Sequence, residues 1–586
     1  MRRAKIVCTL GPASSDRRTI RDLAEAGMSV ARVNSSHGTL ESRREIVETV
    51  RSVDEEIDAP VATMVDMQGP EVRTAPLDEP IHLDAGRDVT FVAGDTATPE
   101  VVGLSYDLDG LAAGDKVLLD DGRIETTVTS VDADGVHAHV DDGGELAGRK
   151  GVNTPGVDLD LDVVTDKDRE DLKLAAEHDV DFVAASFVRD AEDVLEVSQV
   201  LEAFGADVPI VAKIERAGAV DNLEEIIDTA YGVMVARGDL GVELPLEEVP
   251  MIQKRIIRRC QQTGTPVITA TEMLDSMVHE RRPTRAEASD VANAVLDGTD
   301  AVMLSAETAI GDHPVEVVAA MDRIVRQVEG DEAYDESNER RVPGAEESRT
   351  DALARSARYL ARDVGASAIV AGTESGYTAL KVAKYRPSVP IVAATTTDGV
   401  RRQLALSWGV HPQYAPLGVK GADDVIENAV EAALDGGAAS SGDTVVVLSG
   451  MMTELEGTGT TNMLKVHIAA ETLAAGRGVV SGYAAGPLHH VPTGDLTGLP
   501  RGAIVALGPE FDDEFTGDVS KLAGIVDARS GMTGYPAMVA RELGIPMISG
   551  ADVIDDYEGD VVTLDAERGV VYEGEIRREG GDRAEY

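Results

Sequence analysis

At 586 residues the chain is long enough for about four domains, and its net charge of −52 excludes a general binder of nucleic acids or anionic membranes, because both would repel it. The presence of only two cysteines argues against a disulfide scaffold, and nowhere do 18 apolar residues run together, so we expect a cytoplasmic protein. The acid excess, with only 12 lysines and 43% hydrophobic residues, is typical of a folded, halophilic protein from a salt-rich cytosol.

Short β-branched runs alternate with stretches of helical period from Ala4 onward, which is the pattern of parallel βα units. The stretch from Arg285 to Leu296 illustrates the helices, because Thr284 and Glu287 form a capping box before it and Gly298 follows it. Eight such units predict a (β/α)8 barrel, or TIM barrel. The expected strands are Ala4 to Leu10, Ser29 to Val33, Val61 to Asp66, Phe182 to Ser186, Ile210 to Lys213, Val233 to Ala236, Val267 to Ala270 and Ala301 to Leu304.

The segments outside these units differ in composition. Residues 70–153 contain short strand-like pieces and turns, which predict an all-β lid domain inserted into the barrel. Residues 331–350 are rich in charge and contain a Pro-Gly pair, so we expect an acidic, solvated linker. The fold class is therefore α/β, with the barrel at 1–69 and 154–330, the lid at 70–153, the linker at 331–350, an α/β effector-type domain at 351–475 with strands near 368–370, 391–394 and 445–448, and an extra mixed α/β domain at 480–586 with a helix at 537–543.

Polar side chains gather where the expected barrel strands end, and this edge of a TIM barrel carries the active site. Glu215 and Asp239 offer two hard oxygen ligands from neighbouring strands, which suits Mg²⁺ or Mn²⁺. Together with such a metal, Lys213 and Arg32 would form an electrostatic clamp for a phosphoryl group in transit. The strand ends also carry Asn34, Ser36, His37, Asp66 and Thr271.

The motifs around these residues resemble those of the pyruvate kinase family over about residues 1–475. They occur in the same order as in the family, so chance similarity is negligible. The motifs are KIVCTLGPAS at Lys5 to Ser14, RVNSSHG at Arg32 to Gly38, GPEVRT at Gly69 to Thr74, KGVNTPG at Lys150 to Gly156, AKIER at Ala212 to Arg216, ARGDLGVE at Ala236 to Glu243, ATEMLDSM at Ala270 to Met277 and the long run from Arg282 to Ala309.

The resemblance implies transfer of the phosphoryl group of phosphoenolpyruvate to ADP, giving pyruvate and ATP, by a homotetramer. It implies Mg²⁺ at Glu215 and Asp239, charge stabilisation by Lys213, and a place for Thr271 near the enolate carbon that takes up a proton. The substrate residues carried over are Arg32, Lys213, Gly238, Asp239 and Thr271, and the nucleotide residues are Asn34, His37, Arg73 and Lys150, the last two at the edges of the lid.

The same resemblance implies a K⁺ site at Asn34, Ser36, Asp66 and Met67, the last through its backbone carbonyl. K⁺-dependent members usually read Asp-Thr-Lys-Gly-Pro-Glu here, whereas this chain reads Asp-Met-Gln-Gly-Pro-Glu from Asp66 to Glu71. Glu71 follows the K⁺-dependent form, and we expect no lysine beside the site to replace the charge of the ion. The sequence therefore predicts some K⁺ stimulation.

A loop in the α/β domain, Thr373 to Thr378, follows an expected strand and opens a helix. Such a loop presents backbone N–H groups and hydroxyls to a phosphate. Because the family binds effectors there, allosteric control by a phosphorylated effector would use Thr373, Ser375 and Thr378. An ordinary helix-capping turn is the alternative, since Glu374 would repel an anion unless it points away.

Residues 480–586 resemble the swivelling phosphohistidine domain of phosphoenolpyruvate-utilising enzymes, on the motifs GMTGYPA at Gly531 to Ala537 and VARELGIP at Val539 to Pro546. That family carries a Thr-Ser-His triplet, and here Tyr535 stands at the histidine position. A tyrosine, with a pKa of about 10, is a poor phosphate acceptor near pH 7. We therefore expect a structural or regulatory domain, and we expect His489 and His490, outside the motif, to be a surface pair.

Two other functions stay open from the sequence. A Mg²⁺-dependent aldolase acting on a pyruvate enolate would also use a barrel with a carboxylate-bound metal, but it needs no nucleotide site. A non-catalytic metabolite sensor would keep the barrel for binding alone, but it would not need an intact Lys213, Glu215, Asp239 and Thr271.

Overall fold

The computed structural model describes residues 1–159, 161–345, 348–415, 422–449, 461–470, 472–552 and 557–576. Two compact units divide the chain. The first consists of Met1–Arg358, Ala371–Pro416 and Gly450–Asn462, and the second of Tyr359–Val370, Leu417–Ser449 and Met463–Tyr586. Within the described ranges, no helix combines the length and the apolar composition that crossing a membrane requires.

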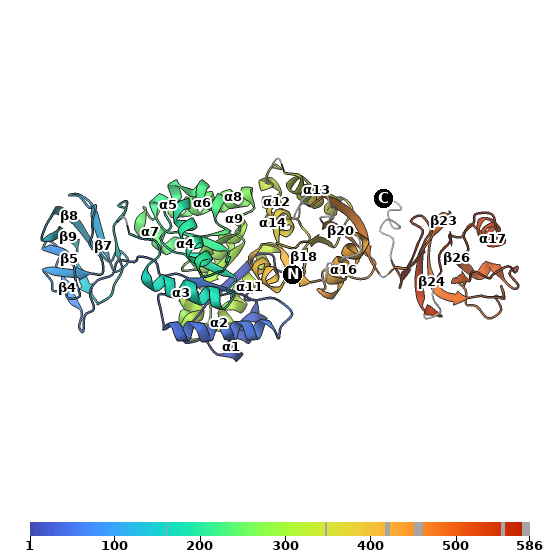
Figure 1. The fold of residues 1–586 in the computed structure, drawn as a ribbon, viewed down its shortest axis with the longest axis horizontal. Coiled ribbons are helices and arrows are strands. Elements are labelled where there is room, and N and C mark those ends of the chain that lie inside the picture. Colours follow the sequence, from blue (N-terminus) through green and yellow to red (C-terminus); the bar gives the residue numbers. More distant parts are fainter. Residues whose placement is uncertain are drawn as a thin grey trace. The chain divides into compact units, whose positions relative to one another are not determined.

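A closed barrel of eight parallel strands lies in the first unit, which confirms the predicted TIM barrel (Figure 1). Around the barrel the strands follow the order β1, β16, β15, β14, β13, β12, β3, β2. Their sequences are short apolar runs because both faces of each strand are buried. The strands are β1 (Lys5–Leu10), β2 (Val30–Asn34), β3 (Ala62–Asp66), β12 (Phe182–Ala185), β13 (Ile210–Ile214), β14 (Gly232–Ala236), β15 (Val267–Ala270) and β16 (Ala301–Leu304).

Large apolar side chains give the barrel a packed core. Met64, Phe182, Met234 and Ile268 belong to one buried cluster with side chains from the other barrel strands. Because strand side chains alternate, neighbouring residues such as Val65 belong instead to a second cluster that includes residues of the surrounding helices.

Several of the helices that cover the barrel begin at a side chain that caps them. Thr39, Thr165 and Thr284 each form a capping box, and Gly298 ends the predicted helix at 285–296 in the left-handed conformation. The helices are α1 (Arg17–Ala26), α2 (Leu40–Asp54), α3 (Asp166–Glu177), α4 (Ala191–Ala203), α5 (Ala217–Asp221), α6 (Leu223–Thr229), α7 (Arg237–Glu243), α8 (Val249–Thr263), α9 (Arg285–Asp297), α10 (Ala306–Ala309) and α11 (Pro314–Glu329).

The segment between β3 and α3 is an all-β insertion, as predicted (Figure 1). A six-stranded sheet has the order β11, β7, β8, β9, β5, β6, and β10 pairs with β4. The strands are β4 (Ile81–Leu83), β5 (Asp88–Ala93), β6 (Val101–Leu104), β7 (Lys116–Leu119), β8 (Ile124–Asp132), β9 (Gly135–Asp142), β10 (Gly144–Leu146) and β11 (Val152–Asn153).

The segment predicted as a solvated linker contains helix α12 (Glu332–Arg341). Tyr334 and Asn338 are buried on one side of it, and Trp408 Nε1 donates to the Tyr334 hydroxyl at 2.9 Å. The prediction of a linker is therefore wrong for these residues. The charged residues dominate the composition, but two residues four positions apart suffice to bind one helix face to the protein.

The elements that follow alternate between helix and strand, and the three strands predicted between 368 and 448 are present. In the first unit β18 pairs with β19 in parallel, and in the second unit β20 pairs with β21 in antiparallel fashion. The elements are α13 (Arg349–Asp363), β17 (Ala368–Gly372), α14 (Tyr377–Lys384), β18 (Ile391–Thr395), α15 (Asp398–Gln403), β19 (Val410–Tyr414), α16 (Ala422–Asp435), β20 (Asp443–Ser449) and β21 (Met463–Ala469).

An eight-stranded sheet, in the order β22, β29, β28, β24, β25, β26, β27, β23, forms the last part of the second unit. The predicted helix at 537–543 is present as α17 (Tyr535–Leu543). The sheet begins with β22, inside the segment predicted as the end of the α/β domain. The strands are β22 (Thr472–Ala475), β23 (Arg477–Val480), β24 (Tyr483–His490), β25 (Ala503–Leu507), β26 (Leu522–Asp527), β27 (Met547–Ser549), β28 (Val561–Asp565) and β29 (Val570–Glu573).

Candidate active site

Lys213 lies at the centre of a polar network at the carboxyl ends of the barrel strands. Its Nζ is 2.5 Å from Glu215 Oε1 and 3.4 Å from Asp66 Oδ1, and it donates to Ser186 Oγ at 2.8 Å. Burial lowers the pKa of Lys213, but the negative charges of Asp66, Glu215 and Asp239 outweigh burial and raise the pKa overall. The side chain is therefore held as a cation.

Arg32 and Asp66 form a buried ion pair beside this lysine. Parallel pairing of β2 and β3 sets Asn34 opposite Asp66, two residues beyond Arg32. Arg32 Nε donates to Asp66 Oδ2 at 2.5 Å, and Arg32 Nη1 donates to Thr9 Oγ1 at 2.8 Å. Burial raises the pKa of Asp66, but the positive charges of Arg32 and Lys213 lower it by more, so the carboxylate stays ionised.

The loop after β15 has a strained backbone that brings Thr271 against Gly238. Thr271 and Glu272 have φ angles of 71° and 53°, in the left-handed region that a β-branched residue rarely adopts. A Cβ at Gly238 would lie 2.7 Å from Thr271 Cγ2, so a glycine is needed there. Arg237 holds the loop, because its Nε donates to the carbonyl of Ala270 at 2.9 Å and its Nη2 to that of Thr271 at 2.7 Å.

Glu215 and Asp239 are two carboxylates that repel each other. Glu215 is buried, whereas Asp239 keeps access to solvent. Loss of hydration raises the pKa of each carboxyl group. For Glu215, the positive charge of Lys213 lowers the pKa and the negative charge of Asp239 raises it further. A divalent cation would relieve this repulsion.

The donor set fits Mg²⁺, which commonly uses one or two carboxylates and takes its other ligands from water and substrate phosphate. Protein ligands alone would not complete such a site: across the ranges that the structure describes, no group of three or more His, Cys, Asp or Glu side chains is arranged to hold a metal ion. The remaining coordination positions would thus be left to water and substrate.

The residues predicted for K⁺ lie at the ends of β2 and β3, where the structure adds a cation that the sequence did not reveal. Asn34 Oδ1 accepts from the N–H of Ser36 at 3.1 Å. Lys167, on α3, donates to the carbonyl of Ser35 at 2.9 Å and contacts Gln68 Oε1. The expectation that no lysine lies beside this site is therefore wrong. The sequence did not indicate Lys167 because it lies 96 or more residues beyond the motif from Asp66 to Glu71.

Besides Asn34, two more of the predicted K⁺ ligands have protein partners. The carbonyl of Met67 accepts from Ser186 Oγ at 2.7 Å, and Asp66 is paired with both Arg32 and Lys213. The structure thus brings Asp66 into the network around Lys213 rather than leaving it to a monovalent ion alone.

The cations predicted to bind the nucleotide are held by acidic residues of the insertion. Arg73 Nη2 is 2.6 Å from Glu71 Oε2, and Lys150 Nζ is 2.7 Å from Asp120 Oδ1. His37 is exposed on the turn after β2. Among the described residues, no hydrogen bond or ion pair joins Arg73, Lys150 or His37 to Lys213, so the structure does not bring them together with it.

Two of the three residues predicted to bind an effector already have hydrogen-bond partners in the protein. The N–H of Thr373 donates to the carbonyl of Ala394 at 2.9 Å, and the hydroxyls of Thr378 and Thr461 lie 2.8 Å apart. Ser375 is exposed, and Gly376 has a φ of 83°. Of the three predicted residues, Ser375 keeps the most accessible side chain.

Sequence reasoning missed residues that orient the predicted ones. Ser186 joins Lys213 to the carbonyl of Met67, and Arg237 holds the carbonyl of Thr271. The N–H of Phe187 donates to Glu215 Oε2 at 3.0 Å. Ser186 could have been found, since it is a small polar residue that ends a predicted strand, but the backbone donor of Phe187 leaves no signal in the sequence.

In the last sheet, Tyr535 starts α17 and packs against an aromatic ring. The ring centroids of Tyr535 and Phe515 are 5.7 Å apart. The histidines expected to be a plain surface pair share one carboxylate, because His489 Nδ1 lies 2.7 Å from Glu558 Oε1 and His490 Nδ1 lies 3.1 Å from Glu558 Oε2.

Comparison with known proteins agrees with this geometry. Residues 1–318 match the sequence model of the pyruvate kinase barrel domain, residues 351–467 that of the pyruvate kinase alpha/beta domain, and residues 499–569 that of the mobile domain of PEP-utilising enzymes. Proteins named pyruvate kinase from Staphylococcus aureus strains MRSA252 and USA300 are 41% identical over 583 residues, which cover 98% of this chain and 99% of theirs.

Proposed function

The chain belongs to the pyruvate kinase family, and from that premise we propose that the network around Lys213 transfers the phosphoryl group of phosphoenolpyruvate to ADP. In this reaction the bond between phosphorus and the enol oxygen breaks, and a bond forms between phosphorus and a terminal oxygen of ADP. The products are ATP and the enolate of pyruvate, which takes up a proton at its terminal carbon.

The observation that carries this proposal is the position of Lys213 between Asp66 and Glu215. Carboxylates from two other positions at the strand ends fix the ammonium group and keep it charged. A preorganised cation of this kind stabilises the charge on a phosphoryl group in transit without moving at the moment of reaction. Arg32, held by Asp66 and Thr9, supplies a second fixed cation for the same group.

Glu215 and Asp239 would hold Mg²⁺, which when bound neutralises charge on the phosphate oxygens and the enolate. Gly238 permits close approach of its backbone to the substrate, since a side chain there would collide with Thr271. Thr271 would stand near the carbon that is protonated, in a loop that Arg237 keeps in one conformation.

Several finer features of the proposal rest on the family. Arg73, Lys150, His37 and Asn34 would bind ADP, K⁺ would assist at Asn34, Ser36, Asp66 and Met67, and a phosphorylated effector would bind at the loop 373–378. We also propose a cytoplasmic homotetramer that works at high salt, in accord with the net charge of −52.

The direct test follows formation of ATP and pyruvate from phosphoenolpyruvate and ADP, with Mg²⁺ present and after its removal by chelation. We expect turnover that requires all three components. Release of a carbon–carbon cleavage product without ADP would indicate an aldolase, and binding of phosphoenolpyruvate without any product would indicate a metabolite sensor.

A further inference from the structure

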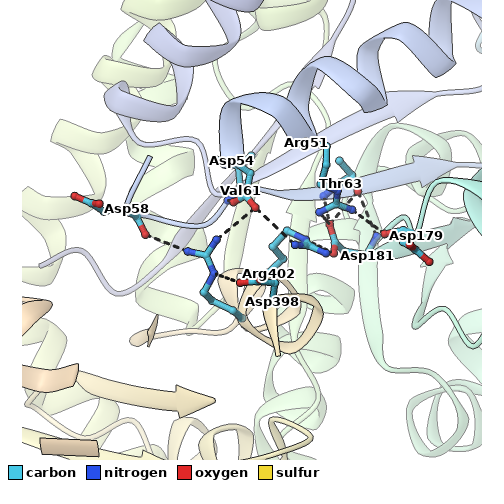
Figure 2. Close-up of polar contacts among 10 residues, drawn as sticks. Arg51, Asp54, Asp58, Val61, Thr63, Asp179, Asp181, Asp398 and Arg402 are labelled. Atoms are coloured by element: carbon cyan, nitrogen blue, oxygen red, sulfur yellow. Dashed lines mark hydrogen bonds and ion pairs between the residues drawn. The ribbon is translucent and has the colours of Figure 1, made fainter. Parts of the chain in front are cut away.

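A cluster of arginines and aspartates lies at the amino ends of β3 and β12 (Figure 2). Lys213 lies near the carboxyl end of β13, at the other end of the barrel. Asp181 immediately precedes β12, and its Oδ2 accepts from the N–H of Thr63 at 2.8 Å and from Thr63 Oγ1 at 2.9 Å. Thr63 belongs to β3, so one buried carboxylate joins the two strands where they begin.

Two consecutive arginines of α15 reach this cluster. Arg402 Nε donates to Asp181 Oδ1 at 2.8 Å, and Arg402 Nη1 is 3.7 Å from Asp54 Oδ2. Arg401 Nη2 is 3.4 Å from the same Asp54 oxygen, but Arg401 does not contact Asp181 among the contacts of the described residues. Of the two arginines, Arg402 therefore links α15 to the carboxylate that joins β3 and β12 in the described structure. Arg51 of α2 reaches the same carboxylate, with its Nη1 3.4 Å from Asp181 Oδ2 (Figure 2).

The other side of α15 borders the loop 373–378. A Cβ built on Gly376 would lie 3.1 Å from Leu404 Cδ2 and 3.5 Å from Val400 Cγ1. Val400 is in α15 and Leu404 follows its last residue, so a small movement of this loop presses directly on the helix that carries Arg402.

The strands that Asp181 joins lead to groups that hold Lys213. β3 ends at Asp66, and Ser186 follows the last residue of β12. The strands pair in register, with Met64 beside Phe182 and Asp66 beside Ala184. β12 has only four residues, paired with β3 at Phe182 to Ala184 and with β13 at Val183 to Ala185, so Asp181 and Ser186 flank one short paired segment.

We infer that Asp181 and Arg402 are positioning residues for the phosphoryl-transfer site, and that α15 couples the loop 373–378 to them. The inference rests on the proposed function. The Arg402–Asp181 pair sets the position of β12 relative to β3. This position in turn sets the distances from Ser186 and Asp66 to the ammonium of Lys213.

The first test compares Arg402→Met with Arg401→Met, its matched control. Each variant removes one partly buried guanidinium that pairs with Asp54, but only the first removes the Arg402 contact to Asp181, which keeps Arg51 and Thr63 as partners. We expect Arg402→Met to lower kcat about tenfold with little change in KM for phosphoenolpyruvate, because small displacements at a catalytic group are costly, and Arg401→Met to stay within about twofold of wild type. Arg402→Lys, which keeps a charge near Asp181, should recover part of the loss.

An activity-independent measurement separates this inference from the proposed function. In hydrogen exchange, amides of residues 182–190 should exchange several-fold faster in Arg402→Met than in Arg401→Met at a temperature where both are folded. If the wild type lacks kinase activity while this difference persists, the proposed function fails alone. Equal exchange and equal kcat in the two variants would overturn the inference.

Two double variants test the route. If Arg402 acts through Ser186, the kcat loss in Arg402→Met with Ser186→Ala will be smaller than the product of the single losses. Gly376→Ala should lower kcat in wild type but have little effect once Arg402 is methionine. Multiplicative losses in the first pair, or an equal or absent effect of Gly376→Ala in both backgrounds, would overturn the coupling.

Discussion

The barrel and the last sheet both place polar residues at the ends of parallel strands, but their ion pairs join different numbers of strands. In the barrel Lys213, which is on β13, contacts Asp66 at the end of β3 and Ser186 after β12. In the last sheet Asp527, at the end of β26, pairs with Arg529 only two residues further along the chain. The barrel network gathers groups of three strands, β3, β12 and β13, around one lysine, which fits a site that holds a charged reacting group.

Replacement of Lys213 in the barrel network should have the largest effect on catalysis. We expect Lys213→Met to lower kcat on the order of 10²- to 10³-fold or more, because a preorganised cation is lost from the transferring phosphoryl group. Lys254→Met, which removes a lysine that pairs with Asp297 on the outer helices, serves as a control and should leave kcat unchanged. Near wild-type turnover by folded Lys213→Met would refute the assignment.

The dependence of turnover on K⁺ tests the charge balance at the ends of β2 and β3. We expect K⁺ to stimulate turnover by about two- to fivefold, less than in a site that depends on the ion fully, because Lys167 already supplies a positive charge near Ser35 and Gln68. Lys167→Met should increase the K⁺ requirement. The assay holds ionic strength constant with a bulky cation, and identical activity with and without K⁺ in both proteins would exclude an ion site.

Salt acts on both regions through the net charge of −52. Repulsion among carboxylates is long-ranged at about 0.01 M salt, whereas at 1 M the screening length falls to about 3 Å. We therefore expect the Tm to rise by at least about 4 °C between these concentrations, which corresponds to the order of 1 kcal/mol of stability. Calorimetry measures the change, and a flat Tm would contradict the halophilic interpretation.

The smallest catalytic effect is expected from the last sheet. A chain cut after Ala470, ahead of β22, should keep kcat within about twofold, since a tyrosine such as Tyr535 is a poor phosphate acceptor near neutral pH. Thermal stability or effector response should change instead. Incubation with ³²P-labelled phosphoenolpyruvate and peptide mapping provides the check, and stoichiometric label within residues 480–586 would show a phosphocarrier.

The sequence predicted the barrel well because the strands are short apolar runs, and several end at or just before a polar residue, as β3 ends at Asp66. It predicted Lys213, Glu215, Arg32 and Thr271 because their motifs are contiguous. It could not reveal Lys167, whose contact partners lie far from it in the chain, or the N–H of Phe187, since every residue but proline has that donor.

Local composition was misleading at α12. Ten residues rich in charge predict a solvated segment, but Tyr334 and Asn338 fall on one face four positions apart and are buried. The helix is specified by which residues share a face rather than by how many are polar.

The insertion between β3 and α3 also bears on how the chain folds. Arg73 and Gly151 form a bridge, and the N–H of Thr74 donates to the carbonyl of Lys150, so the first and last residues of the insertion lie side by side. Once the insertion has folded, its two ends are already together, so the connection between β3 and β12 is shorter by about 80 residues. The entropic cost of closing that connection is therefore lower. Early folding of the insertion should therefore speed formation of the β3–β12 pair, and a variant that replaces residues 74–150 with a tight turn should still assemble the barrel.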